Sequence, residues 1–162
     1  MEERARYHAP VMVTEVLHYL DAARGGIYID GTLGGGGHAG ALLESSANAK
    51  LIGVDQDPDA IRAARERLTA YEDRVTFVQA NFADALEVAG IEPGTISGVL
   101  LDLGISSHQI DEPGRGFTFR SGATLDMRMP GDSSDGESAA DLLNELDAVS
   151  YTHLTLPTIY SV

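Results

Sequence analysis

A glycine-rich stretch, DGTLGGGGH, runs from Asp30 to His38 and follows the apolar run GIYID. Such a turn after the first strand of a βαβ unit lets backbone approach a ligand, at the sheet edge where open α/β sheets bind nucleotides. The stretch continues as GHA and not as the GKS or GKT of a phosphate-binding NTPase loop. The dinucleotide pattern GxGxxA fits Gly34, Gly36 and Ala39, although four glycines in a row match it easily. We therefore expect a nucleotide-like cofactor, with a tight turn that binds nothing as the alternative.

Two acidic residues narrow the choice of cofactor. Asp55 ends a second apolar run, LIGVD, where a carboxylate can accept hydrogen bonds from both hydroxyls of a ribose. This feature suits NAD and S-adenosylmethionine equally. Asp30 separates them, because its negative charge opposes a pyrophosphate but tolerates the cationic amino acid end of S-adenosylmethionine. The pair favours S-adenosylmethionine; an NAD-dependent oxidoreductase and a non-enzymatic nucleotide sensor are the alternatives.

A second candidate site lies in the stretch LLDLGISSHQID, in which an apolar run delivers Asp102 to the carboxyl edge of the sheet. The lone pair of an exocyclic base amine is delocalised into the ring. Hydrogen bonds from the amine to a carboxylate or a carbonyl help to redirect that lone pair toward a methyl group. We predict Asp102 and the backbone carbonyl of Leu103 as these acceptors, the alternative being that Asp102 only caps the loop.

A later segment, EPGRGFTFRSGATLDMRM, mixes arginines with aromatic residues. This mixture is expected where single-stranded nucleic acid binds, since guanidinium groups hold phosphates and rings stack on bases. The candidates for contact with RNA are Arg115, Phe117, Phe119, Arg120 and Arg128. Alternatively, the segment is a lid that packs its phenylalanines into a core and pairs its arginines with neighbouring acids.

Alternating apolar runs and helical periods predict the elements that position these residues. The predicted strands are Gly26–Asp30, Leu51–Asp55, Val75–Gln79 and Ile96–Leu103, and the predicted helices cover 38–46, 57–71, 82–90 and 137–146. The last strand is nearly all apolar and suits the centre of a sheet. Residues 105–136 form a long segment rich in Gly, Ser, Asp and Arg. The fold class is α/β: a Rossmann-like, incomplete parallel sheet with helices on both faces.

Composition limits the remaining possibilities. The chain has 162 residues, enough for one compact domain, and no cysteine, which excludes disulfides and thiolate metal sites. We predict no bound metal. No apolar stretch approaches the length of a bilayer span, and the charged N-terminus MEERARYHAP lacks the apolar core of a secretory signal. We expect a cytoplasmic protein without membrane contact.

The net charge of −14 ordinarily counts against nucleic acid as a partner, because affinity for phosphates comes largely from Lys and Arg. The only lysine is Lys50, but three of the ten arginines fall within the arginine and aromatic segment. The net negative charge then belongs to the rest of the protein surface.

Several motifs together resemble a known family. HAPVM, YIDGTLGGGGH, GVDQDPDAI, LLDLGISSHQID, RGFTF, LDMRM and SAADLLN occur in this order, as in the bacterial MraW-type methyltransferases that modify cytosine N4 in small-subunit ribosomal RNA. The resemblance spans roughly His8 to Asn144. It implies a class I, S-adenosylmethionine-dependent methyltransferase that acts on a cytidine of 16S rRNA in the small ribosomal subunit, near the decoding centre.

The resemblance also implies which residues contact the cofactor. Together with Gly34 from the glycine pattern, they are Gly36, Gly37, His38, Asp55, Phe82, Asp102 and Gln109. If His38 makes its contact through the backbone alone, its imidazole matters little. Phe82 either flanks the adenine or belongs to the core, and His8 is expected to cap or pack against the first helix. His108 replaces the family's usual proline, which predicts a looser loop around Gln109.

The resemblance stops near Ala148, where the family continues with an inserted helical domain and then completes the methyltransferase core. The tail VSYTHLTLPTIYSV instead resembles a translated sequencing adapter, so we predict that residues 149–162 are non-native, the alternative being a divergent strand. Residues 1–104 are then the N-terminal part of the methyltransferase core, and 105–148 are a loop and the start of the substrate-binding helical region. We expect a truncated enzyme that is inactive alone, with an exposed sheet edge.

Overall fold

The computed structural model describes residues 10–92 and 94–155; the expectations for His8 and for residues 156–162 lie outside this range. The chain divides into two compact units, a first unit of Met1–His108 and a second unit of Gln109–Val162. Within the described residues, no helix has both the length and the apolar character needed to cross a bilayer.

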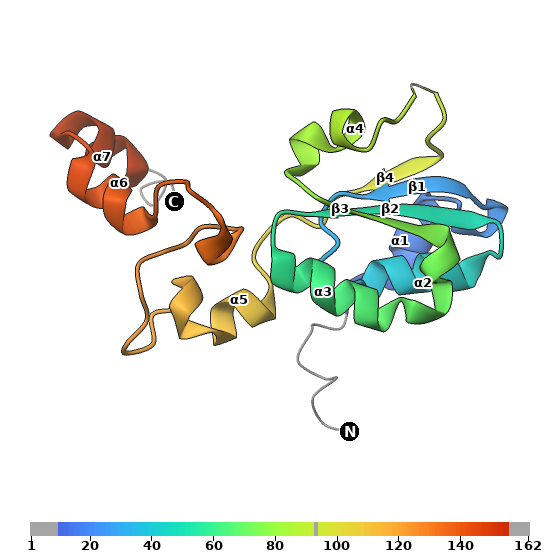
Figure 1. Ribbon diagram of the computed structural model, residues 1–162, viewed down its shortest axis with the longest axis horizontal. Helices are drawn as coiled ribbons and strands as arrows, with labels where there is room; N and C mark the ends of the chain where they lie inside the picture. Colours follow the sequence, from blue (N-terminus) through green and yellow to red (C-terminus); the bar gives the residue numbers. More distant parts are fainter. Residues whose placement is uncertain (1–9, 93, 156–162) are drawn as a thin grey trace, which may run out of the picture. The chain divides into compact units, whose positions relative to one another are not determined.

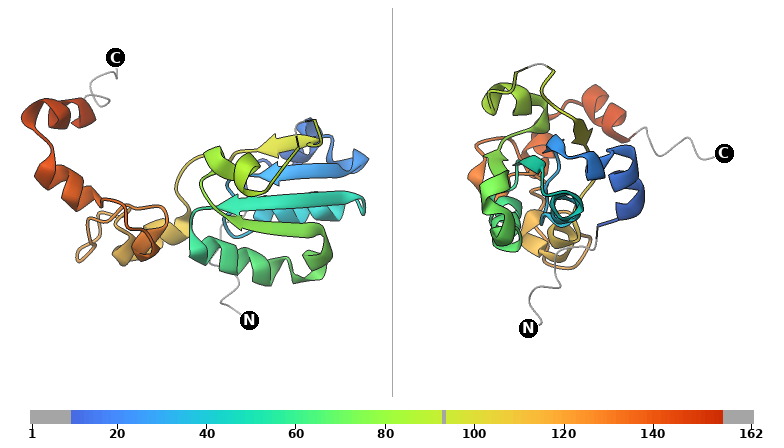
Figure 2. Two further views of the ribbon diagram at one scale, coloured as in Figure 1. Left: turned by 45° about the horizontal axis from the view of Figure 1, so that its top comes forward. Right: turned by 90° about the vertical axis from the view of Figure 1, so that its right-hand side faces the viewer.

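The first unit is built on a parallel sheet of four strands in the order β3-β2-β1-β4 (Figure 1). The strands are β1 Gly26–Asp30, β2 Ala49–Asp55, β3 Val75–Gln79 and β4 Gly98–Leu100. The helices are α1 Val13–Tyr19, α2 Gly37–Ser45, α3 Pro58–Arg67 and α4 Ala85–Val88, and short 3₁₀ turns cover Ala22–Arg24, Thr69–Arg74 and Phe82–Asp84. Helices α2 and α3 cover one face of the sheet and α4 the other (Figures 1 and 2), which confirms the predicted fold class.

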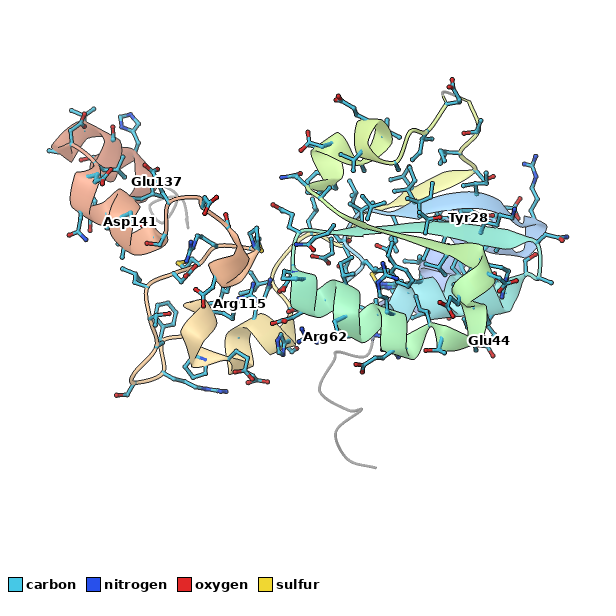
Figure 3. All side chains as sticks on the ribbon, viewed as in Figure 1. Tyr28, Glu44, Arg62, Arg115, Glu137 and Asp141 are labelled. Carbon is cyan, nitrogen blue, oxygen red and sulfur yellow. The ribbon has the colours of Figure 1, made fainter. Side chains whose placement is uncertain are left out.

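Two apolar layers hold the sheet, because successive strand residues point to opposite faces. Tyr28 of β1 packs with Leu43 and Leu68 in one buried layer, while its neighbour Ile29 packs with Val54 in the other. Tyr28 lies within the sheet (Figure 3) and its hydroxyl donates to the carbonyls of residues 21 and 25. Burial raises the pKa of this phenol. A buried ring with a bonded hydroxyl fixes the start of β1.

Helix α3 is shorter than the predicted 57–71. Asp57 caps its start, because the Asp57 carboxylate accepts a hydrogen bond from the N–H of Asp59, and Pro58 is the first residue of the helix. It ends at Arg67, and the chain continues as a 3₁₀ segment, Thr69–Arg74. A buried Leu68 at this junction packs into the core.

Strand β4 differs from its prediction in both length and place. It pairs only over Gly98–Leu100 and lies at the edge of the described sheet, although Ile96–Leu103 was expected at the centre. Among the described residues no strand pairs with its outer side. Val99 of β4 is 54% exposed, and Leu103, which follows the strand, is 68% exposed. The all-apolar pattern of a central parallel strand therefore lies here on an open edge.

The second unit contains short helices and no strand among its described residues. Its elements are α5 Ser107–Asp111, which starts just before the boundary, 3₁₀ turns at Pro113–Arg115 and Gly131–Ser133, α6 Ala139–Glu145 and α7 Ala148–Thr155. The helix predicted over 137–146 is confirmed as α6, which starts at a capping box between Ser138 and Asp141. The predicted loop of 105–136 includes α5 and both turns.

Candidate active site

The register of the sheet gathers three acidic residues at one edge. Asp30, the last residue of β1, pairs with Gly53 of β2 and Leu100 of β4. Asp55 and Asp102 each follow two residues later in their own segments. Because the strands are parallel, all three acids lie at the carboxyl edge, where the glycine-rich loop leaves β1.

The glycines of this loop have separate structural reasons. Gly34 and Gly36 have φ of +51° and +73°, which other residues rarely adopt. A Cβ at Gly36 would meet Ala64 of α3 at 3.3 Å, and one at Gly37 would meet the ring of Pro10 at 3.0 Å. A Cβ at Gly34 would meet only the Thr32 carbonyl, at 3.9 Å. Gly36 and Gly37 thus permit packing within the protein, while Gly34 leaves open space beside the loop.

Asp55 ties this loop to the end of β2. Its Oδ2 accepts a hydrogen bond from the N–H of Gly34 at 2.8 Å, and its Oδ1 accepts one from the N–H of Asp57 at 2.9 Å. Burial raises the pKa of Asp55, against the effect of these two N–H groups. Each carboxylate oxygen has a second lone pair. The predicted bonds from ribose hydroxyls are therefore compatible with the two bonds that Asp55 already accepts.

Asp30 is almost completely buried, with 2% of its surface exposed. Burial raises its pKa to about 7; the N–H of Thr32, which donates to Asp30 Oδ1 at 3.2 Å, and the charge of His38 act in the opposite direction. The charges of Asp55 and Asp102 raise the pKa further. A cationic group beside Asp30 would favour its ionised form, whereas a pyrophosphate would oppose it. The site thus fits the cationic amino acid end of S-adenosylmethionine better than a dinucleotide.

Asp102 is held by a residue that the sequence analysis did not single out. Its N–H donates to Oγ1 of Thr32 at 2.6 Å, and the N–H of Gly31 donates to the carbonyl of Leu100 at 2.9 Å. These bonds join the loop after β1 to the segment after β4. The Asp102 side chain is 48% exposed, so it is accessible to a ligand. The only sequence signal for Thr32 was its place between Asp30 and the glycines.

The imidazole of His38 has partners within the protein, and its contact with a cofactor, through the backbone or otherwise, stays a prediction. Nε2 lies 2.7 Å from the carbonyl oxygen of Val11, and Nδ1 lies 3.8 Å from Oδ2 of Asp102. Only 9% of the side chain is exposed. His38 therefore connects the segment before α1 with Asp102.

Phe82 and Leu103 lie at the same edge. A Cβ on Gly31 would meet Cβ of Phe82 at 3.0 Å and the side chain of Leu101 at 2.6 Å, so Phe82 packs beside the start of the loop. The Phe82 side chain is partly exposed, at 41%. This exposure favours the predicted flank of a ligand over a place in the core. Leu103 is also exposed, and the role of its carbonyl as an acceptor stays a prediction.

Gln109 belongs to the second unit and is buried. Its Nε2 donates to the sulfur of Met129 at 3.5 Å, and its contact with a cofactor stays a prediction. His108, which replaces the family's proline, lies within α5, and its Nε2 is 3.9 Å from a carboxylate oxygen of Asp59. The helical conformation and this partner argue against the looser loop that was expected here.

Two arginines of the predicted RNA segment hold the segment itself. The guanidinium of Arg115 (labelled in Figure 3) donates to the carbonyls of residues 128 and 129. Arg128 pairs with Asp126 at 2.6 Å and donates to the carbonyl of Ser134, and this pairing lowers the pKa of Asp126. The loop of the second unit is thus held by partly buried polar bonds.

The other three residues of this set differ in exposure. Arg120 pairs with Asp111 at 3.0 Å but is 61% exposed. Phe117 is half-buried, whereas Phe119 is fully exposed and packs in no core. The lid alternative therefore holds for the ion pairs of Arg120 and Arg128 and fails for Phe119.

Comparison with known sequences identifies the family. A sequence model of the MraW methylase family matches residues 5–156. The chain belongs to the MraW methylase family. It is 54% identical over 144 residues to the ribosomal RNA small subunit methyltransferase H of Geotalea uraniireducens, and 50% identical over 143 residues to that of Heliobacterium mobile. Each alignment covers 86% of this chain and 45% of the relative, so this MraW-family chain spans less than half the length of these relatives.

Comparison with solved structures concerns the fold alone. A protein of Klebsiella pneumoniae that has been proposed to be an O-methyltransferase aligns with a TM-score of 0.51 at 19% identity, over 61% of this chain and 46% of that protein. The sheet order and the helices on both faces agree with this likeness. The MraW-family chain therefore has the Rossmann-like fold of class I methyltransferases.

Proposed function

We propose that the protein transfers a methyl group from S-adenosylmethionine to the N4 amine of a cytidine in 16S rRNA of the small ribosomal subunit, in the cytoplasm. The observation that carries this proposal is the arrangement of Asp30, Asp55 and Asp102 around the glycine-rich loop. Relatives about half identical to this chain are named ribosomal RNA small subunit methyltransferase H, which supports the choice of RNA. The matching family and the relatives named above are methyltransferases by name and give no support to the oxidoreductase alternative.

The residues of the first unit divide the task of holding the cofactor. Asp55 accepts hydrogen bonds from the ribose hydroxyls, Asp30 faces the cationic amino acid end, and Phe82 flanks the adenine. The open space beside Gly34 admits the ligand close to the backbone, with Gly36, Gly37 and His38 shaping the rest of the loop. S-adenosylmethionine, when bound, supplies an electrophilic methyl group on a sulfonium that leaves as a neutral thioether.

Asp102 acts on the other reactant. Its carboxylate and the carbonyl of Leu103 accept hydrogen bonds from the two amine hydrogens, which directs the nitrogen lone pair toward the methyl group. Thr32 fixes the backbone of Asp102, so that the acceptor is positioned before the RNA arrives. Because the leaving group departs neutral, no strong general acid is needed, and positioning supplies much of the acceleration.

In the second unit we propose that Phe119 and Arg120 contact RNA directly, since both are exposed. An exposed ring offers a stacking surface to an unpaired base, and a guanidinium can exchange Asp111 for a phosphate. Arg115, Phe117 and Arg128 shape the loop that presents them.

The test uses the full-length gene product with small ribosomal subunits that lack the modification. Mass spectrometry of digested 16S rRNA should detect N4-methylcytidine, and Asp102→Ala should abolish it. Calorimetric titration should show binding of S-adenosylmethionine that Asp55→Ala weakens, and no binding of NAD. Binding of NAD, or modification of RNA that persists in Asp102→Ala, would contradict the proposal.

A further inference from the structure

Thr32 is bonded to two acids that the proposed function assigns to different reactants. Its main-chain N–H donates to Oδ1 of Asp30 at 3.2 Å, and its side-chain Oγ1 accepts from the N–H of Asp102 at 2.6 Å. Under the proposed function, Asp30 faces the methyl donor and Asp102 faces the amine that receives the methyl group. Thr32 therefore connects the two halves of the site.

The loop that contains Thr32 is tied to the strands on both sides of β1. The N–H of Gly34 donates to the carboxylate of Asp55 at the end of β2, and the N–H of Gly31 donates to the main chain of β4. In both bonds the loop contributes a main-chain group, which nearly every residue type has. The bond between Asp102 and Thr32 instead uses a side chain of the loop, so a substitution in the loop can remove it.

The threonine hydroxyl sets the distance between the loop and the segment after β4. The branched Cβ of Thr32 restricts χ1 and so holds the hydroxyl in one direction. The oxygen lets the nitrogen of Asp102 approach to 2.6 Å. A carbon atom in the place of this oxygen would keep that nitrogen at about 3.5 Å, and would therefore displace the Asp102 segment by roughly 1 Å.

We propose that Thr32 is a positioning residue that sets the gap between the methyl donor and the accepting amine. This inference rests on the proposed function. Methyl transfer needs the amine nitrogen, the methyl carbon and the sulfur in line, and a misplacement of about 1 Å can cost about 100-fold in rate. Thr32 is assigned to contact neither reactant, so its loss should lower kcat without weakening the binding of either one.

Three substitutions in the full-length gene product test this role. Thr32→Val nearly keeps the shape of the side chain but presents a carbon atom to Asp102, whereas Thr32→Ser keeps the oxygen. Thr69→Val is the matched control, because Thr69 is exposed, begins the 3₁₀ segment after α3 and donates its hydroxyl to carbonyls of residues 65 and 66. The measurements are kcat and KM with small subunits that lack the modification, the affinity for S-adenosylmethionine by calorimetry, and the urea midpoint of unfolding.

The expected result for Thr32→Val is a loss of about 100-fold in kcat, with KM and the affinity for S-adenosylmethionine within about twofold of the wild-type values. The bond to Asp102 is exposed, so water can replace the lost acceptor and the urea midpoint should stay close to that of the wild-type protein. Thr32→Ser should retain kcat within about threefold, since its oxygen is present but its χ1 is less restricted. Thr69→Val should leave all four quantities unchanged.

A Thr32→Val variant that keeps the wild-type kcat would overturn the proposal. Equal losses in Thr32→Val and Thr32→Ser would also overturn it, as would a loss of stability and cofactor affinity in parallel with kcat, which would make Thr32 a support for the loop. If Thr32→Val does not fold, Thr32→Ala replaces it and should lose at least about tenfold in kcat, because Asp102 is then no longer held. A wild-type protein that does not methylate RNA would refute the proposed function instead.

Discussion

The two units of this chain are stabilised in different ways. The first unit buries two apolar layers against its sheet, with Tyr28, Leu51 and Val54 almost fully enclosed. Among the described residues of the second unit, the buried ones are Gln109, Gly116 and Gly131, and α6 buries none. Its shape depends on arginine bonds to backbone carbonyls and on a capping box. Apolar burial therefore holds the region of the proposed chemistry, and polar bonds hold the region proposed to meet RNA.

The largest expected effect concerns the apolar layers. Leu51→Ala should lower the free energy of unfolding by ~4 kcal/mol, because it removes a fully buried side chain and leaves a cavity. Leu143→Ala in α6 is the matched control: this side chain is 42% exposed, and its loss should cost less than ~1 kcal/mol. Urea unfolding followed by circular dichroism measures both. Equal losses would mean that α6 belongs to an apolar core after all.

A slightly smaller effect should depend on pH. The pKa of Asp30 is raised from 3.8 to about 7 in the folded protein. The folded state therefore holds a proton that the unfolded state releases between these values, and stability falls as pH rises through that window. The free energy of unfolding of Asp30→Asn should equal that of the wild-type protein near pH 4. Near pH 8 it should exceed the wild-type value by ~3 kcal/mol. A difference that does not change with pH would show that Asp30 does not titrate in this range.

A substitution at one glycine should disrupt the loop of the second unit that Arg115 and Arg128 hold. Gly116 has φ +77°, and a Cβ there would lie 2.6 Å from the nitrogen of Asp126. Gly116→Ala should destabilise this loop by more than ~2 kcal/mol, because backbone strain and a backbone clash combine. Gly122→Ala is the control: its φ is +86° but no atom lies within 4 Å, so only the strain of ~1 kcal/mol remains. In Gly116→Ala, hydrogen exchange should be faster in residues 109–155 only. An equal loss of stability in Gly116→Ala and Gly122→Ala would show that the clash makes no contribution.

The smallest expected effect is that of an exposed ion pair. Arg120→Gln should change the free energy of unfolding by less than ~0.5 kcal/mol, because Arg120 and Asp111 are both about three-fifths exposed. The same variant should weaken binding to a 16S rRNA fragment in a filter-binding assay and reduce the salt dependence of that binding. A large loss of stability with unchanged RNA binding would assign Arg120 to the fold.

The elements that depend on local pattern could be predicted from the sequence. Strands β1 and β3 have the predicted bounds, and β2 begins two residues early. The parallel order then brings Asp30, Asp55 and Asp102 to one edge. β4 was misjudged because an apolar run does not tell whether a neighbouring strand is present.

Contacts between distant segments could not be predicted. The bond between Asp102 and Thr32 joins residues 70 positions apart, and neither residue type nor spacing announces it. The loop of the second unit is held by bonds from Arg115 and Arg128 to main-chain oxygens, which follow no period. The sequence therefore allowed two interpretations of these arginines, as contacts for RNA or as partners of neighbouring acids within a lid.

The oxygen that lies 2.7 Å from Nε2 of His38 belongs to the main chain of Val11, whose own side chain is half exposed. Every amino acid offers the same carbonyl, so replacing Val11 leaves the acceptor in place. A scan of single substitutions would classify position 11 as tolerant. Deleting Val11, or shifting the segment by one position, would remove the carbonyl that contacts His38, an effect that the scan does not detect. The contact depends on the path of the main chain and not on the type of residue at position 11.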